Sequence, residues 1–185
     1  MHIAERLYLS GYLTYPRTES TSYPQKFGFK EVAASLKNIQ EYGQYCNSLL
    51  NEERMKFPKA GKDAGDHPPI TPTTKIPNKG TLRNDEWRVY DFVSRHFLST
   101  IGQDGKFMKK SVKFSCGKFS FSLSGSCLID PGFQDITPWI KVADNLIPDF
   151  KIGQKLPVSI VDIVTGQVIF LIFSNSVDLT PRSLD

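Results

Sequence analysis

One short stretch of the chain combines residue types that could carry out chemistry on a phosphate. Tyr15 and Arg17 are separated by Pro16, and proline favours an extended backbone in the residue before it. Because side chains two apart on an extended backbone point to the same side, the spacing predicts that Tyr15 and Arg17 share a face. A tyrosine hydroxyl has a pKa near about 10 and needs a site that stabilises its anion before it can act as a nucleophile. The Arg17 guanidinium could stabilise that anion and also clamp a phosphate through its paired donors.

From spacing alone, a purely structural explanation is the commoner one. A surface turn with one buried tyrosine and one solvated arginine has the same Tyr-x-Arg pattern, which occurs in many chains. His67, in a proline-rich loop, is by itself an ordinary loop imidazole. Neither feature therefore assigns a function without further support.

Four lysines offer a second candidate contact with nucleic acid. Lys106, Lys109, Lys110 and Lys113 flank the start of a predicted β-hairpin and could follow a phosphate backbone. Charges on a strand more often form a solvated face, and that alternative stays open here.

The elements that must position these residues follow from hydrophobic spacing and turn residues. Apolar positions recur with a helical period in three segments, and they alternate with polar positions in others. We predict helices over 2–10, 29–41 and 84–100 (with Asn84 as N-cap), an extended segment at 12–15, a loop over 58–79, a hairpin of 112–116 and 119–123 turning at 117–118, and a strand at 156–163.

This order of elements predicts an α+β fold, with a helical first half and a β-rich second half meeting near residue 103.

The chain has 185 residues, with 23 Lys and Arg against 19 Asp and Glu, a net charge of +4. This mild basic excess is compatible with a nucleic-acid partner. No apolar run approaches the roughly 20 residues of a membrane span, and we expect no membrane association and no secretory signal. Three cysteines without a C-x-x-C pair argue against a zinc site or disulfide framework and favour a reducing compartment.

Three motifs in order resemble those of the type IA DNA topoisomerases. Residues 4–8 and 11–21, read as A-E-R-L-Y and G-Y-L-T-Y-P-R-T-E-S-T, are similar to the active-site segment of the topoisomerase III branch. Residues 63–72, D-A-G-D-H-P-P-I-T-P, are similar to the histidine motif of its beta subgroup. Residues 131–133 with 138–139 are similar to the β-rich gate region. The resemblance covers roughly residues 1–162.

The resemblance implies a role for each matching residue. Tyr15 would be the nucleophile that attacks single-stranded DNA, Arg17 would hold the scissile phosphate, and His67 would lie beside them as the third catalytic residue. Arg17, Thr18 and His67, with Lys106, Lys109 and Lys110, would contact the nucleic acid. The reaction exchanges one phosphodiester for another, so the family needs no ATP.

The resemblance also implies a domain plan and partners. Residues 1–103 would form the winged-helix-like catalytic-tyrosine domain (domain III), residues 104–162 part of the all-β gate arch (domain II), and residues 163–185 a tail without a counterpart. The family uses Mg²⁺, whose acidic ligands belong to a Toprim domain and not to this sequence, so we expect no metal ligands here. Single-stranded DNA is the implied substrate and RNA a further one; a Tudor-domain protein is the implied partner, and the nucleus, with the cytoplasm besides, the implied location.

The missing acidic pattern leads us to expect a fragment of a longer enzyme, inactive on its own. Two other hypotheses stay open for such a chain: a module that binds single-stranded nucleic acid without cutting it, and a nonfunctional product that retains the motif. We also expect the second half to fold only marginally, because part of an arch leaves strand edges uncovered.

Overall fold

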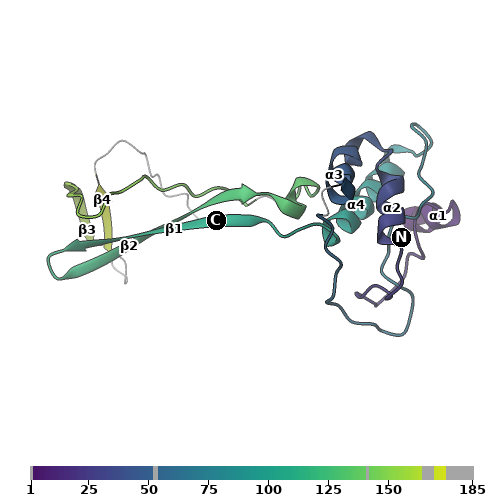
Figure 1. The fold of residues 1–185 in the computed structure, drawn as a ribbon, viewed down its shortest axis with the longest axis horizontal. Coiled ribbons are helices and arrows are strands. Elements are labelled where there is room, and N and C mark those ends of the chain that lie inside the picture. Colours follow the sequence, from purple (N-terminus) through teal and green to yellow (C-terminus); the bar gives the residue numbers. More distant parts are fainter. Residues whose placement is uncertain (1, 52–53, 141, 164–168, 174–185) are drawn as a thin grey trace.

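The computed structural model describes residues 2–51, 54–140, 142–163 and 169–173. It contains four helices and two antiparallel strand pairs, so the predicted α+β class is confirmed. Figure 1 shows the helices gathered at one end of an elongated molecule, with a long hairpin extending from them. Most of the tail predicted over 163–185 lies outside the described residues, at 164–168 and 174–185. No helix in the described ranges is long and apolar enough to cross a membrane.

The helical end is built from α1 (His2–Leu9), α2 (Phe29–Leu36), α3 (Gln40–Asn51) and α4 (Asn84–Thr100). α1 packs on α4, and α2 packs on α3. The core residues are buried apolar side chains from all four helices, among them Leu7, Leu36, Tyr42, Cys46, Tyr90, Phe97 and Leu98. The first helix was predicted over 2–10, and its position is confirmed within one residue.

The predicted helix over 29–41 is wrong in one respect, because the chain breaks it into α2 and α3. After Leu36 the backbone tightens into shorter turns, in which Asn38 N donates to Ser35 O at 3.2 Å and Ile39 N donates to Leu36 O at 3.0 Å. Ile39 is still buried after this turn, so the apolar spacing continues across the break and conceals it. The remainder of α3, with Gly43 in its interior, was not predicted.

The predicted helix over 84–100 is confirmed, with a different N-cap. α4 begins at Asn84, and the residue before it, Arg83, occupies the cap position. The Glu86 carboxylate accepts a hydrogen bond of 2.9 Å from the backbone N–H of Arg83, which is the return half of a capping box. The predicted inward face is confirmed, since Tyr90 and Phe97 are buried and Trp87 packs beside them.

The second part of the chain is dominated by the predicted hairpin. β1 (Lys106–Cys116) and β2 (Phe119–Asp130) pair antiparallel, with Ser111 opposite Ser124 and a two-residue turn between the strands. Gly117 in that turn has a φ of +58°, which a glycine adopts without steric cost. A 3-10 helix, η1 (Gly132–Asp135), follows β2 and contacts α4.

The chain after η1 returns along the hairpin. Asn145 pairs with Ser126 as an isolated bridge, and the Phe150 ring meets the Phe114 ring edge to face at 5.1 Å. The chain then forms β3 (Val158–Ile163), which pairs antiparallel with β4 (Ile169–Phe173). The predicted strand at 156–163 is therefore confirmed from Val158 onward. Figure 1 places β3 and β4 near the far end of the hairpin.

Candidate active site

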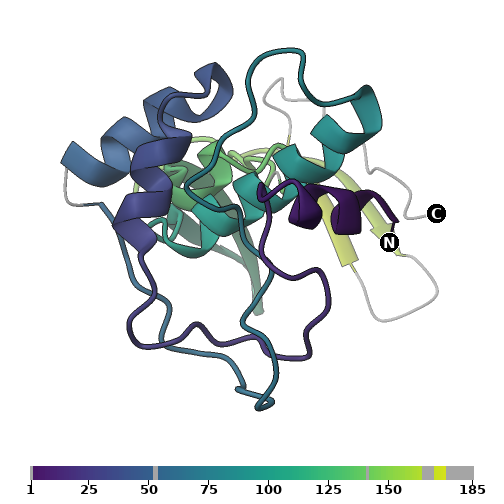
Figure 2. The same cartoon turned by 90° about the vertical axis from the view of Figure 1, so that its right-hand side faces the viewer.

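Two irregular segments far apart in the sequence run antiparallel beside each other and carry the residues of the candidate site. Thr14 N donates to Thr71 O at 2.9 Å, and Thr73 N donates to Tyr12 O at 3.0 Å. Further along, Thr21 N donates to Lys62 O at 2.8 Å. We call this pairing of residues 11–22 with residues 62–73 the zipper. Figure 2 shows these two loops side by side below the helices.

The extended segment predicted at 12–15 and the loop predicted at 58–79 meet in the zipper. Leu13 forms an isolated bridge with Pro72 and is 1% exposed, so its side chain anchors the zipper in the core. The hydroxyl of Thr14 accepts a hydrogen bond of 2.8 Å from Thr71 N. The segment just before Tyr15 is therefore fixed by backbone pairing and by a buried leucine.

The zipper brings Tyr15 against His67. Their ring centroids are 4.2 Å apart with an angle of 43° between the planes. On another side, the ring of Tyr8 from α1 meets Tyr15 edge to face at 5.3 Å. Tyr15 is nevertheless 37% exposed, so its ring is held by two aromatic neighbours while part of it faces solvent.

Thr18 and Arg17 lie next along the same segment. The Thr18 hydroxyl donates a hydrogen bond to the backbone carbonyl of His67, which is a second contact between the tyrosine motif and the histidine motif. Arg17 is exposed, and its guanidinium forms no ion pair within the described ranges. Tyr15, Arg17, Thr18 and His67 therefore lie together at the helical end, with a cationic group open to solvent.

Asp66 is a site residue whose role the sequence reasoning missed. Its carboxylate accepts hydrogen bonds from the hydroxyls of Ser20 and Thr18 and from the backbone N–H of Glu19, the last at 2.7 Å. The Ser20 hydrogen bond, followed by that of the Glu19 backbone, lowers the pKa of Asp66. Asp66 precedes His67 in the histidine motif, but no local spacing rule pairs it with donors more than forty residues earlier.

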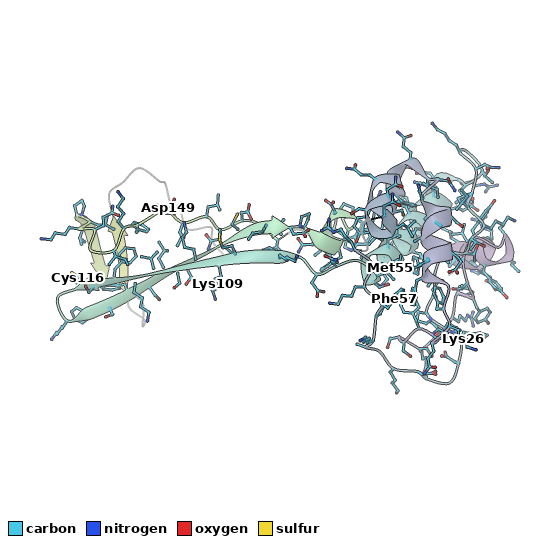
Figure 3. The ribbon with its side chains drawn as sticks, in the orientation of Figure 1. Lys26, Met55, Phe57, Lys109, Cys116 and Asp149 are labelled. Carbon is cyan, nitrogen blue, oxygen red and sulfur yellow. The ribbon has the colours of Figure 1, made fainter. Side chains whose placement is uncertain are left out.

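The three lysines predicted to contact nucleic acid lie elsewhere, on β1. Lys106 Nζ is 4.0 Å from an Asp130 carboxylate oxygen, and Lys110 forms an ion pair with Asp149. Lys109 is exposed, and Figure 3 places it along the hairpin, well away from the helices. The structure thus gathers the tyrosine and histidine motifs and leaves these lysines in a separate region.

The acidic residues near Tyr15 do not form a magnesium site. Both carboxylate oxygens of Asp66 are already used as acceptors by this chain. Across the described residues, no group of three or more His, Cys, Asp or Glu side chains is arranged to hold a metal ion. The donors present therefore do not fit a hard divalent cation, which prefers several oxygen ligands at once.

Comparisons with known proteins agree with the two motifs that the zipper joins. The family model described as DNA topoisomerase matches residues 1–168. The chain is 40% identical to DNA topoisomerase 3-beta of Oryza sativa subsp. japonica over 166 residues, and 40% identical to that of Drosophila melanogaster over 168 residues. It is 38% identical to DNA topoisomerase 3-beta-1 of Homo sapiens over 168 residues. Each alignment covers 90% of this chain and 19% of the relative, so the chain spans about a fifth of the length of these relatives.

The matched region includes all of the zipper and the whole of the first hairpin. It thus contains the active-site segment, the histidine motif and the gate-like segment on which the resemblance rested. The chain belongs to the type IA DNA topoisomerase family, and within it to the proteins that resemble topoisomerase III beta.

Proposed function

We propose that this chain carries the strand-cleaving tyrosine of a type IA topoisomerase, with Tyr15 as the nucleophile. The observation that supports this most strongly is the contact between the Tyr15 and His67 rings at 4.2 Å. It joins two motifs of the family that lie on separate segments of the chain. Tyr15 itself is 37% exposed, and Arg17, two residues later in the chain, is exposed as well.

The proposed reaction is a transesterification on single-stranded DNA. The Tyr15 oxygen forms a bond to phosphorus, and the bond between phosphorus and the 3′ oxygen breaks. Tyr15 loses a proton and the released 3′ oxygen gains one, so the products are a 5′-phosphotyrosyl bond and a 3′ hydroxyl. One phosphodiester replaces another, and the reverse reaction rejoins the strand without ATP.

Arg17 and His67 have separate roles in this proposal. Arg17 would hold the scissile phosphate, since a guanidinium offers paired donors to phosphate oxygens and stabilises the charge that develops on them. His67 would orient the Tyr15 ring and donate to a phosphate oxygen. Thr18, bonded to the His67 carbonyl, would keep the two segments in register and contact the strand.

The proposal extends to the domain plan. Residues 1–103 would be the winged-helix-like tyrosine domain and residues 104–162 part of the gate arch, with residues 163–185 outside both. Lys106, Lys109 and Lys110 would line the passage used by the nucleic acid, which is supported by the exposure of Lys109. Lys106 and Lys110 would first have to leave their carboxylate partners.

The whole-protein properties are proposals as well. We infer strand passage that changes DNA topology, RNA as a further substrate, a Tudor-domain protein as partner, and a location in the nucleus and also the cytoplasm. Mg²⁺ would offset phosphate charge during the reaction, with ligands from outside the described residues of this chain.

A second candidate is a module that binds single-stranded nucleic acid without cutting it. The observation favouring it is that Arg17 and Lys109 are exposed and free to meet a phosphate backbone. Binding through such charges would weaken steeply as salt rises, because counterions are released from the phosphates.

Covalent trapping separates the two candidates. The 185-residue chain is incubated with Mg²⁺ and a labelled single-stranded DNA, denatured, and run on a gel. A labelled adduct with the parent chain and none with Tyr15→Phe, which keeps the ring and lacks the nucleophilic oxygen, would support Tyr15 as the nucleophile and would overturn the expectation that this chain is inactive on its own. Tyr8→Phe is the matched control: it removes the hydroxyl of the neighbouring ring and should leave the adduct.

The two outcomes lead to different functions. An adduct that survives Tyr15→Phe would refute Tyr15 as nucleophile. Salt-dependent binding of the same oligonucleotide without any adduct would favour the binding module for this chain. An RNA of the same sequence, run in parallel, measures whether the site accepts a 2′ hydroxyl.

A further inference from the structure

We propose that Asp66 is a positioning residue for the reaction at Tyr15. Its carboxylate fixes the segment that carries Tyr15 and Arg17 against the segment that carries His67. The inference rests on the proposed function, because positioning matters only where Tyr15 reacts.

The geometry assigns this role to both oxygens of the carboxylate. Oδ1 accepts from the Ser20 hydroxyl, and Oδ2 accepts from the backbone N–H of Glu19 at 2.7 Å. The Thr18 hydroxyl oxygen lies 3.2 Å from Oδ1 and shares its one proton between Oδ1 and the His67 carbonyl. Three consecutive residues, beginning one position after Arg17, are therefore held by one side chain. Asp66 is itself exposed and immediately precedes His67, so its place in the chain determines where the His67 backbone lies.

A buried residue anchors this surface carboxylate. Ser20 is 6% exposed, and its Oγ also accepts a hydrogen bond of 3.0 Å from Ala64 N. The Ser20 hydroxyl thus bonds to the 62–73 segment twice, through Ala64 and through Asp66. The two segments are therefore joined both by a buried contact, between Ala64 and Ser20, and by surface contacts of Asp66.

Asp63, in the same loop, provides a natural comparison. Its carboxylate accepts a hydrogen bond of 2.9 Å from the backbone N–H of Gly65, two residues later. That contact closes a turn within the loop, whereas the contacts of Asp66 reach residues 18–20. Two aspartates of equal charge and similar exposure therefore differ in whether they connect the two halves of the site.

The charge of Asp66 argues for positioning and against strand binding. A carboxylate repels a phosphate, so an acidic side chain near Arg17 does not improve affinity for nucleic acid. Its benefit must lie in the arrangement of its neighbours. Loss of Asp66 should then leave oligonucleotide affinity unchanged or tighter while it slows the reaction.

The first test measures the arrangement directly, by nuclear magnetic resonance on the full chain. Asp66→Asn keeps the side-chain shape, but one carboxylate oxygen becomes an NH2 group, which donates and cannot accept from the donors on that side. We expect faster hydrogen exchange at the Glu19 amide and a weaker ring-to-ring signal between Tyr15 and His67. Asp63→Asn, the matched control, should leave both as in the parent.

The second test measures the reaction and binding separately. We expect Asp66→Asn to slow covalent adduct formation by roughly tenfold to a hundredfold, the scale of loss when reacting groups are slightly misplaced, while the dissociation constant for the oligonucleotide stays within twofold or falls. Asp66→Glu, which keeps the carboxylate, should restore part of the rate. A variant that is merely unfolded would instead lose binding and rate together.

The outcomes distinguish a failure of this inference from a failure of the proposed cleavage function on which it rests. If the parent forms no adduct, the proposed cleavage fails for this chain, and the resonance measurements alone decide the role of Asp66. Unchanged Glu19 exchange and an unchanged Tyr15–His67 signal in Asp66→Asn would overturn the inference, as would an adduct rate equal to that of the parent. Should Asp66→Asn fail to fold, Ser20→Ala removes one of the same hydrogen bonds and is expected to shift both readouts in the same direction.

Discussion

At the scale of single residues, the helical end contains two tyrosines on α3 whose hydroxyls differ in their partners. Tyr42 is fully buried and its hydroxyl donates to the Asp91 carboxylate at 2.8 Å. Asp91 also accepts from Arg95 Nε at 2.8 Å. The hydroxyl oxygen of Tyr45 is buried too, but it has no hydrogen-bond partner in the part of the chain that the structure describes. Burial raises the pKa of both tyrosines, and the Asp91 charge adds to the effect at Tyr42.

This difference predicts opposite effects for the same substitution. Tyr42→Phe should lower the free energy of unfolding by about 1–2 kcal/mol, because it leaves the carboxylate short of a charge-assisted hydrogen bond. Tyr45→Phe should be neutral or stabilising by up to about 1 kcal/mol, because it removes a polar atom whose burial is uncompensated. Urea unfolding of both variants checks the pair, and an equal loss of stability in the two would contradict the argument.

At the scale of elements, the joint between the hairpin and the helical end is held by Asp130 at the end of β2. Its carboxylate accepts two hydrogen bonds from Arg54, at 2.8 and 2.7 Å, and one of 3.0 Å from Gly132 N. The Gly132 hydrogen bond and the Arg54 guanidinium hold the pKa of Asp130 below its ordinary value. A lowered folded-state pKa stabilises the fold above the unfolded-state pKa, and this stabilisation is lost as pH falls through the folded-state pKa.

The contacts of Asp130 therefore predict that replacing it changes the melting temperature by an amount that depends on pH. Asp130→Asn should lower the melting temperature at pH 7. Its difference from the parent should shrink as pH falls below about 4, where Asp130 of the unfolded parent takes up its proton, and should disappear below the lower folded-state pKa. Asp104→Asn is the control, since Asp104 pairs with Lys56 at an exposed position and such pairs contribute little. Thermal unfolding from pH 3 to pH 7 measures both, and a constant difference across that range would argue against the role of Asp130.

The elements differ in how far the sequence could predict them. α4 and the hairpin were predicted because a strong helical period in one case, and alternation around Gly117 in the other, leave few competing structures. The break between α2 and α3 was missed because Ile39 preserves the apolar spacing. The zipper was beyond local patterns altogether, since it pairs irregular segments through backbone groups that any residue carries. The Tyr15–His67 contact could therefore be expected only through family resemblance, and the link through Asp66 not at all.

At the scale of the whole molecule, burial is distributed unevenly along the chain. Up to Val158, the last residue whose burial is described, the buried apolar side chains lie between Leu7 and Ile101, with Ile136 as the exception. In the first hairpin, which lies between Ile101 and Ile136, β2 pairs with the described part of the returning segment only through the bridge at Asn145, and Phe119, Ile129 and Met108 are exposed. A two-stranded hairpin with so little cover is marginally stable.

We accordingly predict two levels of protection from hydrogen exchange. Backbone amides of β1 and β2 should exchange at least roughly tenfold faster than those in the middle of α4, because partial opening of the hairpin leaves the helical core intact. Exchange followed by mass spectrometry on the full chain gives both rates in one experiment. Equal protection in the hairpin and α4 would mean that the two parts unfold as one unit.

The zipper has a consequence for how the chain folds while it is being synthesised. Residues 11–22 are synthesised first, and α2 and α3 are made before residues 62–73 emerge. Closing so long a loop costs conformational entropy before its contacts can form, although folding of the two intervening helices shortens the gap. On a ribosome Tyr15 therefore has no His67 partner until residues 62–73 emerge, and under the proposed function the newly made chain cannot yet cleave a nearby nucleic acid.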